Sequence, residues 1–312
     1  MLTLTHASGS TADVFVGFGF NCYRLRLVAG EKSADVLYAH PNFTSGQERP
    51  SGSGVPILFP FPGRIPGGKY SWDGVDYTLP ATDGRGNAIH GFVHLRRWRL
   101  LEQSATRAVG QFQASVDDPT ILKLWPADFR ITATYTLEAA ALTMEYLVEN
   151  PDDKPLPCGL GTHPYYKLPI GGPSADECLI SLPVRRQWEL VELLPTGRQI
   201  GLPAGTECDK PAAFGPLQFD SVFTDLSRGA DGWSQASVSD PAAGLTLAAR
   251  FSGEFRECVV YTPPHRQAIC IEPLTCVPGA IGLHSQGIEA GLKILAPGES
   301  FQATVRFELQ HS

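Results

Sequence analysis

Alternation of apolar and polar positions is the dominant pattern of this chain, and it is clearest over residues 129–150. There, apolar side chains occupy every second position in two consecutive stretches. A period of two is typical of strands that bury one face. The short link from Glu138 to Ala141 predicts a hairpin, although its alanines would also suit a helical turn by propensity.

Weaker versions of the same pattern extend over the whole chain. Alternation predicts strands at residues 23–27 and 301–309, and Asp73-Gly74 predicts a tight turn within residues 70–79. Residues 55–65 are apolar but carry three prolines, so we expect an extended segment packed against a sheet. No long amphipathic helix pattern is present. The sequence predicts an all-β, largely antiparallel chain, and 312 residues fit a single domain over 1–312.

The segment at residues 268–275 is apolar on both faces, which predicts a central strand that is covered on both sides. Alternation places Glu272 on the same face as Ala268 and Cys270. Burial disfavours the charged form of a carboxyl group and raises its pKa, which makes a useful proton acceptor near neutral pH. A structural ion pair with a buried arginine is the alternative role for Glu272.

Two histidines lie beside glycines. His163 sits in Gly159-Leu-Gly-Thr-His-Pro-Tyr-Tyr-Lys, where the glycines permit close approach of a ligand or a strand, and Tyr165 and Tyr166 offer flat walls for a cleft. His90 ends a second glycine-rich stretch, residues 83–91. The alternatives are a satisfied core histidine for His163 and a loop histidine with one backbone hydrogen bond for His90.

Three further polar residues are candidates for binding. Arg64 ends the proline-rich segment, and Asp220 and Asp225 bring carboxylates to an apolar region. A solvated loop arginine and turn or capping aspartates are the alternative interpretations. The run Arg96-Arg97-Trp98-Arg99 is interpreted as the polar side of a strand.

Composition excludes several classes of function. The formal net charge is −7 without any Lys/Arg run, so nothing favours a nucleic-acid binder. No apolar run approaches membrane-spanning length, no leader pattern begins the chain, and the seven scattered cysteines contain no Cys-x-x-Cys pair. We therefore expect a cytoplasmic protein without a metal site. General acid–base chemistry on a neutral ligand, with no cofactor, fits the candidate residues best.

A series of short motifs resembles the aldose 1-epimerase (mutarotase) family, in the family's order along the chain. Each motif is short, so their combination is what is specific. They are Asn21, Pro56-Ile-Leu-Phe-Pro-Phe-Pro-Gly-Arg64-Ile, Asn87-Ala-Ile-His90-Gly91, Tyr135 with Leu142 and Asn150, Gly161-Thr-His163-Pro-Tyr165, Phe219-Asp220 and Ile271-Glu272-Pro273.

The resemblance implies a galactose mutarotase-like supersandwich, a large antiparallel β-sandwich with a sugar-binding cleft on one face. It also implies that Glu272 is the base that takes the proton of the anomeric hydroxyl, and that His163 is the acid that protonates the ring oxygen. Ring opening, rotation about C1–C2 and reclosure would then give the other anomer. The implied activity is that of a cofactor-independent isomerase.

By the same resemblance, Arg64, His90 and Asp220 would bind sugar hydroxyls, with Asp225 as the alternative to Asp220. The implied partner is a small-molecule sugar, with no nucleic acid and no membrane, and the protein is expected to be a monomer or a homodimer.

The sequence leaves the substrate open. After His90 the chain continues Gly-Phe-Val-His-Leu-Arg-Arg-Trp, closer to the branch that acts on hexose 6-phosphates, whereas the segment ending at Arg64 is unusual for that branch. Arg96, Arg97 or Lys69 are candidate phosphate ligands, with solvent exposure as their alternative role. A non-catalytic carbohydrate-binding protein on the same fold is the alternative of another class. A glycoside hydrolase, which would need two carboxylates flanking the bond, is a third.

Overall fold

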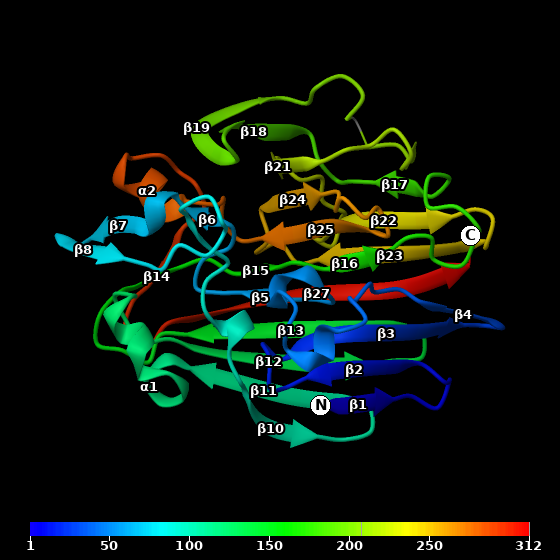
Figure 1. The fold of residues 1–312 in the computed structure, drawn as a ribbon, viewed down its shortest axis with the longest axis horizontal. Helices are drawn as coiled ribbons and strands as arrows, with labels where there is room; N and C mark the ends of the chain where they lie inside the picture. The colour runs from blue at the N-terminus through cyan, green and yellow to red at the C-terminus, as the bar shows by residue number, and fades with distance from the viewer. Residues whose placement is uncertain (207, 312) are drawn as a thin grey trace.

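The computed structural model describes residues 1–206 and 208–311, and antiparallel β-sheets dominate it (Figure 1). In this part of the chain the largest sheet has nine strands. Their order is β10 (Arg99–Gln103), β11 (Arg107–Gln113), β12 (Arg130–Leu137), β13 (Ala141–Glu149), β27 (Ser300–His311), β23 (Leu245–Phe251), β22 (Ser234–Asp240), β17 (Leu179–Ser181) and β20 (Ala212–Ala213).

A second sheet and a smaller N-terminal sheet accompany the largest one. The second runs β19 (Leu194–Gly201), β18 (Arg186–Val191), β21 (Asp220–Thr224), β24 (Glu257–Tyr261), β25 (Ala268–Leu274), β15 (Gly161–Thr162) and β5 (Ile57–Leu58), with β16 (Tyr165–Lys167) also paired to β25. The N-terminal sheet contains β1 (Leu2–Thr5), β2 (Thr11–Phe15), β3 (Asn21–Ala29) and β4 (Lys32–Asp35).

The remaining elements are short. Paired strands are β6 (Arg64–Ile65) with β9 (Ala88–Ile89), β7 (Lys69–Trp72) with β8 (Val75–Thr78), and β14 (Leu156–Cys158) with β26 (Lys293–Leu295). The helices are α1 (Ala114–Asp117) and α2 (Ala280–Ser285), and 3₁₀ turns cover Phe43–Ser45, Pro50–Gly52, Pro66–Gly68, Val93–Leu95 and Pro119–Lys123. Among the described residues, no helix combines the length and apolar character that crossing a membrane requires.

The predicted hairpins are confirmed. Burial alternates at every second residue along β12, and the Glu138 N–H donates to the Ala141 carbonyl over 2.8 Å, so the link is a tight turn and not a helical one. Asp73 and Gly74 adopt positive φ values of 48° and 76° between β7 and β8, the conformation that a two-residue hairpin turn requires.

The interpretation of residues 96–99 as one strand is wrong in part, because β10 begins only at Arg99. Trp98 is buried, and its indole Nε1 donates to the Val93 carbonyl over 3.0 Å. This contact holds the chain in a loop before it reaches the sheet.

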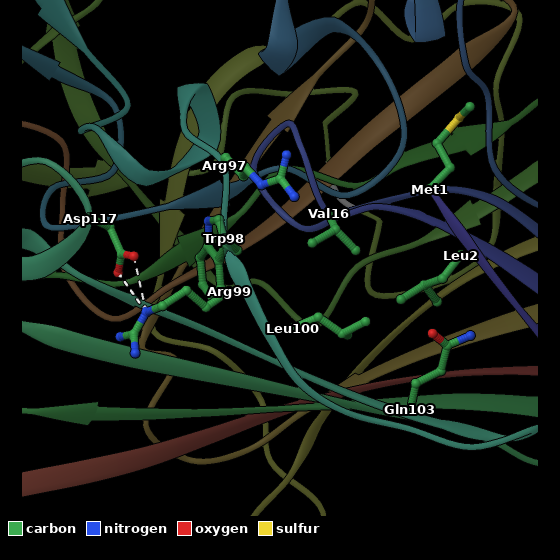
Figure 2. A pocket seen from close by; sticks show the side chains of 9 residues that line it. All are labelled: Met1, Leu2, Val16, Arg97, Trp98, Arg99, Leu100, Gln103 and Asp117. Atoms are coloured by element: carbon green, nitrogen blue, oxygen red, sulfur yellow. Dashed lines mark hydrogen bonds and ion pairs between the residues drawn. The ribbon is translucent and has the colours of Figure 1, made fainter.

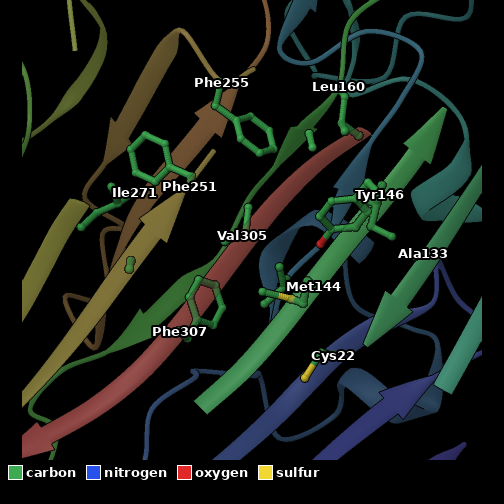
Figure 3. Packing of buried hydrophobic residues seen from close by; sticks show 14 of the residues in the cluster. Cys22, Ala133, Met144, Tyr146, Leu160, Phe251, Phe255, Ile271, Val305 and Phe307 are labelled. Atoms are coloured by element: carbon green, nitrogen blue, oxygen red, sulfur yellow. The ribbon is translucent and has the colours of Figure 1, made fainter. Parts of the chain in front are cut away.

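The hydrophobic core lies between the largest sheet and the other two. Tyr166 of β16 packs edge-on against Phe307 of β27 with ring centroids 5.2 Å apart, and the Tyr135 hydroxyl of β12 donates to the Phe20 carbonyl. Figure 3 shows how side chains from β13, β23, β25 and β27 meet in this layer, among them Met144, Tyr146, Phe251, Ile271, Val305 and Phe307. The fold is therefore a sandwich of antiparallel sheets.

Strand β25 is central, as its apolar sequence predicts. All seven of its residues are buried, and it pairs with β24 on one side and with β15 and β16 on the other. Ile269 and Ile271 enter the main core, whereas Ala268 and Cys270 pack with Tyr165 on the opposite face. This confirms the predicted division of faces and directs Glu272 away from the main core.

Candidate active site

One cleft of about 550 Å³ collects all five residues that the sequence singled out for the site. This volume lies within the range of small-molecule sites in proteins. These five residues are Arg64, His90, His163, Asp220 and Glu272, and other residues line the cleft beside them. The cleft is lined both by strands of the second sheet and by the loops that carry the glycine-rich motifs.

His163 and Glu272 face one another across the pairing of β25 with β15 and β16. Gly161 pairs with Leu274, and Tyr165 pairs with Cys270, so the same register places His163 opposite Glu272. The His163 Nε2 lies 3.3 Å from the Glu272 Oε1, and the two side chains are only 8% and 4% exposed. Residues more than 100 positions apart thus form a buried pair at hydrogen-bond distance.

Burial shifts both members of this pair toward their neutral forms. Burial raises the pKa of Glu272 well above its usual value. The negative charge of Asp220 raises this pKa further, and the positive charge of Arg64 lowers it. Burial, with a smaller contribution from His94, lowers the pKa of His163 to about 3. Burial therefore favours a pair with one proton, a neutral Glu272 carboxyl beside a neutral His163.

His90 is held in a left-handed backbone conformation at φ 67°, which is uncommon for a residue with a side chain. Its N–H donates to the Gly63 carbonyl, and its ring centroid lies 5.4 Å from that of His163 at an interplanar angle of 78°. Burial lowers the pKa of His90 well below 6.5, and its Nδ1 has no hydrogen-bond partner within the described chain. His90 is thus a cleft residue as well as a loop histidine with a backbone hydrogen bond.

Arg64 and Asp220 also face the cleft. The Arg64 Nε lies 3.1 Å from the Asp83 Oδ2 with the arginine side chain 22% exposed, so it is not simply a solvated loop residue. Asp220 is the first residue of β21, and its side chain is exposed to the cleft. Partial desolvation raises the pKa of Asp220, whereas the positive charges of Arg64 and Arg85 lower it. Asp225 lies at the other end of this strand and does not line the cleft.

The comparison with known proteins decides the family. The sequence model of the aldose 1-epimerase family matches residues 1–308. The chain belongs to the aldose 1-epimerase family. It is 25% identical over 292 residues to a protein of Escherichia coli (strain K12) named uncharacterized protein YihR, covering 89% of this chain and 88% of that one.

Solved structures show the same fold. A galactose mutarotase-like protein from Clostridium acetobutylicum superposes with a TM-score of 0.87 at 21% identity, covering 98% of this chain and 94% of that one. The galactose 1-epimerase from Lactobacillus acidophilus gives a TM-score of 0.74 at 20% identity, covering 99% and 94%. The predicted galactose mutarotase-like sandwich is confirmed.

In this aldose 1-epimerase family member, the segment around His163 contributes residues both to the cleft and to the core. Tyr165 lines the cleft, but the expectation that Tyr166 forms a wall of it is wrong, because Tyr166 is buried in the core. Gly159 and Gly161 allow close packing of neighbouring residues of the chain, and not the approach of a ligand. A Cβ on Gly161 would lie 2.4 Å from the Leu274 Cδ2.

The basic residues suggested as phosphate ligands lie elsewhere. Arg96 pairs with Asp118 at 2.7 Å, and neither Arg96, Arg97 nor Lys69 lines the cleft. Figure 2 shows Arg97 among the residues that line a separate surface pocket, which Met1 and Val16 also line.

Sequence reasoning missed several residues of the cleft, which come from loops, from the 3₁₀ turn Val93–Leu95 and from strand β24, and whose positions depend on distant contacts. They include Arg49, Asp83, Arg85, His94 and Tyr261. The only sequence signal for Asp83 and Arg85 was their place in the glycine-rich approach to His90. Among the described residues, no three His, Cys, Asp or Glu side chains converge as a metal site would require.

Proposed function

We propose that this protein is an aldose 1-epimerase that interconverts the α and β anomers of an aldose. The observation that carries the proposal is the buried pair formed by the His163 Nε2 and the Glu272 Oε1, 3.3 Å apart in the cleft. Mutarotation needs a base at the anomeric hydroxyl and an acid at the ring oxygen. Because both oxygens are bonded to C1, two adjacent side chains suit the task.

In the proposed reaction, Glu272 takes the proton from the anomeric O1–H, and the electron pair of that bond forms the C1=O1 carbonyl. The C1–O5 bond breaks, its electron pair goes to O5, and O5 takes a proton from the His163 Nε2. Rotation about C1–C2 presents the other face of the aldehyde, and the reverse transfers close the ring. Each transfer contributes roughly 10²–10⁴-fold to the rate.

The proton count of the pair suits this cycle. The pair starts with one proton and regains that number after each turnover. Moving the proton from the Oε1 of Glu272 to the Nε2 of His163 leaves the net charge of the pair unchanged. Arg64 favours that move, since its charge lowers the pKa of Glu272. In this scheme Arg64, His90 and Asp220 hold the sugar hydroxyls, and only protons are transferred.

The test is anomer exchange measured by NMR over a panel of neutral and 6-phosphorylated aldoses, with the spontaneous rate subtracted. We expect acceleration for at least one aldose. Saturable binding without acceleration would identify a non-catalytic sugar-binding protein instead. Release of reducing ends from an oligosaccharide would identify a glycoside hydrolase.

A further inference from the structure

Two arginines of the cleft have no part in the proposed proton transfers. Arg49 and Arg85 line the same cleft as His163 and Glu272, and both side chains are exposed. Within the described ranges, 1–206 and 208–311, neither guanidinium donates a hydrogen bond or forms an ion pair. Such free, permanently charged donors are available to a ligand.

The acidic residue of the loop that carries Arg85 is already engaged by other hydrogen-bond donors. The Asp83 carboxylate accepts hydrogen bonds from the Arg64 Nε, the Arg85 backbone N–H, and both the backbone and side-chain nitrogens of Asn87. Its side chain is 1% exposed. Burial acts to raise the pKa of Asp83, but these hydrogen bonds outweigh it and lower the pKa to about 2. Asp83 therefore balances Arg64 and fixes the Arg85 backbone, while the Arg85 guanidinium stays free.

Burial also acts on the other two carboxyl groups of the cleft. Burial raises the pKa of Glu272 and that of Asp220. Arginine remains charged at all accessible pH values. With Glu272 shifted toward its neutral form, the three arginines of the cleft, Arg49, Arg64 and Arg85, outnumber its two other carboxylates, Asp83 and Asp220, although the whole chain carries a formal charge of −7. A cleft of one sign with low-dielectric walls raises the local concentration of oppositely charged ligands.

We propose that Arg49 and Arg85 form a subsite for an anionic group on the aldose, a phosphate or a carboxylate carried away from the anomeric carbon. Guanidinium forks match the oxygens of both groups in geometry and charge. The hydroxyls of Ser51 and Thr82, which also line the cleft, supply further donors. The proposal rests on the proposed function for the chemistry at C1, and it defines the class of aldose.

The charges of the arginines indicate how such a sugar would lie. The charge of Arg64 lowers the pKa of both Asp220 and Glu272, whereas the charge of Arg85 lowers the pKa of Asp220. Arg85 is therefore on the Asp220 side of the cleft. An anionic group bound by Arg85 would therefore lie on that side of the cleft, with its charge balanced by the guanidinium.

The experiment compares sugars that differ only at C6: glucose, glucose 6-phosphate and glucuronate, with the corresponding galactose series. Anomer exchange is measured by NMR for the wild type, for the double variant Arg49→Gln/Arg85→Gln, and for Arg97→Gln. The last variant removes the same kind of charge from an exposed arginine outside the cleft. The quantity compared is the ratio of kcat/KM for each anionic sugar to that for its neutral parent.

We expect the wild type to favour an anionic sugar by about 10-fold or more, and the double variant to lose about 10-fold of that ratio, while Arg97→Gln keeps it. Added salt should lower the ratio. The phosphate and carboxylate arms show which oxyanion is preferred. The proposal is overturned if the wild type has the same kcat/KM for the anionic sugars and for their neutral parents. It is also overturned if the preference for an anionic sugar survives in the double variant.

Failure of the proposed function is a separate outcome. If no sugar exchanges above the spontaneous rate, calorimetric binding of the same sugars decides the subsite. Tighter binding of an anionic sugar that is lost in the double variant supports the subsite without catalysis. Equal or absent binding of anionic and neutral sugars overturns it.

Discussion

The rings of His163 and Tyr165 lie parallel, with centroids 4.9 Å apart and 3° between their planes. A functional imidazole is usually oriented by a hydrogen bond to its second nitrogen. Here the buried Nδ1 of His163 has no hydrogen-bond partner in the described part of the chain. The stack on Tyr165, which β16 fixes against β25, therefore holds the imidazole plane that presents Nε2 to Glu272.

Replacing the stacking ring tests this positioning role. We expect Tyr165→Leu to lower kcat by about 10-fold or more, because small misplacements of a catalytic group cost up to about 10²-fold. Tyr165→Phe keeps the stacked ring and should restore most of the rate. Steady-state kinetics by polarimetry provide the measurement. Equal losses in both variants would point to the hydroxyl and not to the stack.

The pH dependence of the rate follows from the proton count of the pair. The one-proton pair gains a second proton only as the pH falls toward the His163 pKa of about 3, and loses its proton only above the raised pKa of Glu272. The account therefore predicts a kcat/KM that is flat through pH 6.5, with an alkaline fall governed by a carboxyl group. Rates measured between pH 4 and 9 provide the check. An inflection near 6.5, the ordinary histidine pKa, would contradict it.

The glycine after His90 is required for steric reasons. Gly91 has φ 69°, and a Cβ there would lie 2.1 Å from the Phe59 carbonyl oxygen. Gly84 has a similar φ of 75° but no atom within 4 Å of such a Cβ. We expect Gly84→Ala to cost about 1 kcal/mol through the backbone alone, and Gly91→Ala at least about 3 kcal/mol. Urea unfolding of the two variants measures the difference, and equal costs would show that the contact with Phe59 does not matter.

Much of the architecture could be predicted from the sequence, because strand burial is written into local patterns. The alternation along β12 and β13 and the two-sided apolar character of β25 identified a hairpin and a central strand. Glu272 stood out for the same reason, as an ionisable residue in a segment otherwise suited to the core.

What the sequence could not predict depends on partners far along the chain. The exposure and hydrogen bonds of an arginine are not local properties, so the sequence could offer Arg96 and Arg97 as candidate phosphate ligands but could not decide between that role and solvent exposure. In the fold Arg96 pairs with Asp118, whereas Arg49 and Arg85 line the cleft. The position of Gly161 against Leu274 likewise arises only when β15 pairs with β25.

The central claim is that Glu272 and His163 together transfer protons to and from a sugar, and the isosteric variant Glu272→Gln tests it most directly. Anomer exchange by NMR is compared for the wild type, Glu272→Gln and Asp225→Asn, the last an exposed carboxylate outside the cleft that undergoes the same acid-to-amide change. Circular dichroism and unfolding of each variant show that the fold is retained.

The account predicts that Glu272→Gln lowers the exchange rate by at least about 100-fold while Asp225→Asn stays near the wild type. A folded Glu272→Gln variant with a near-wild-type rate would contradict it.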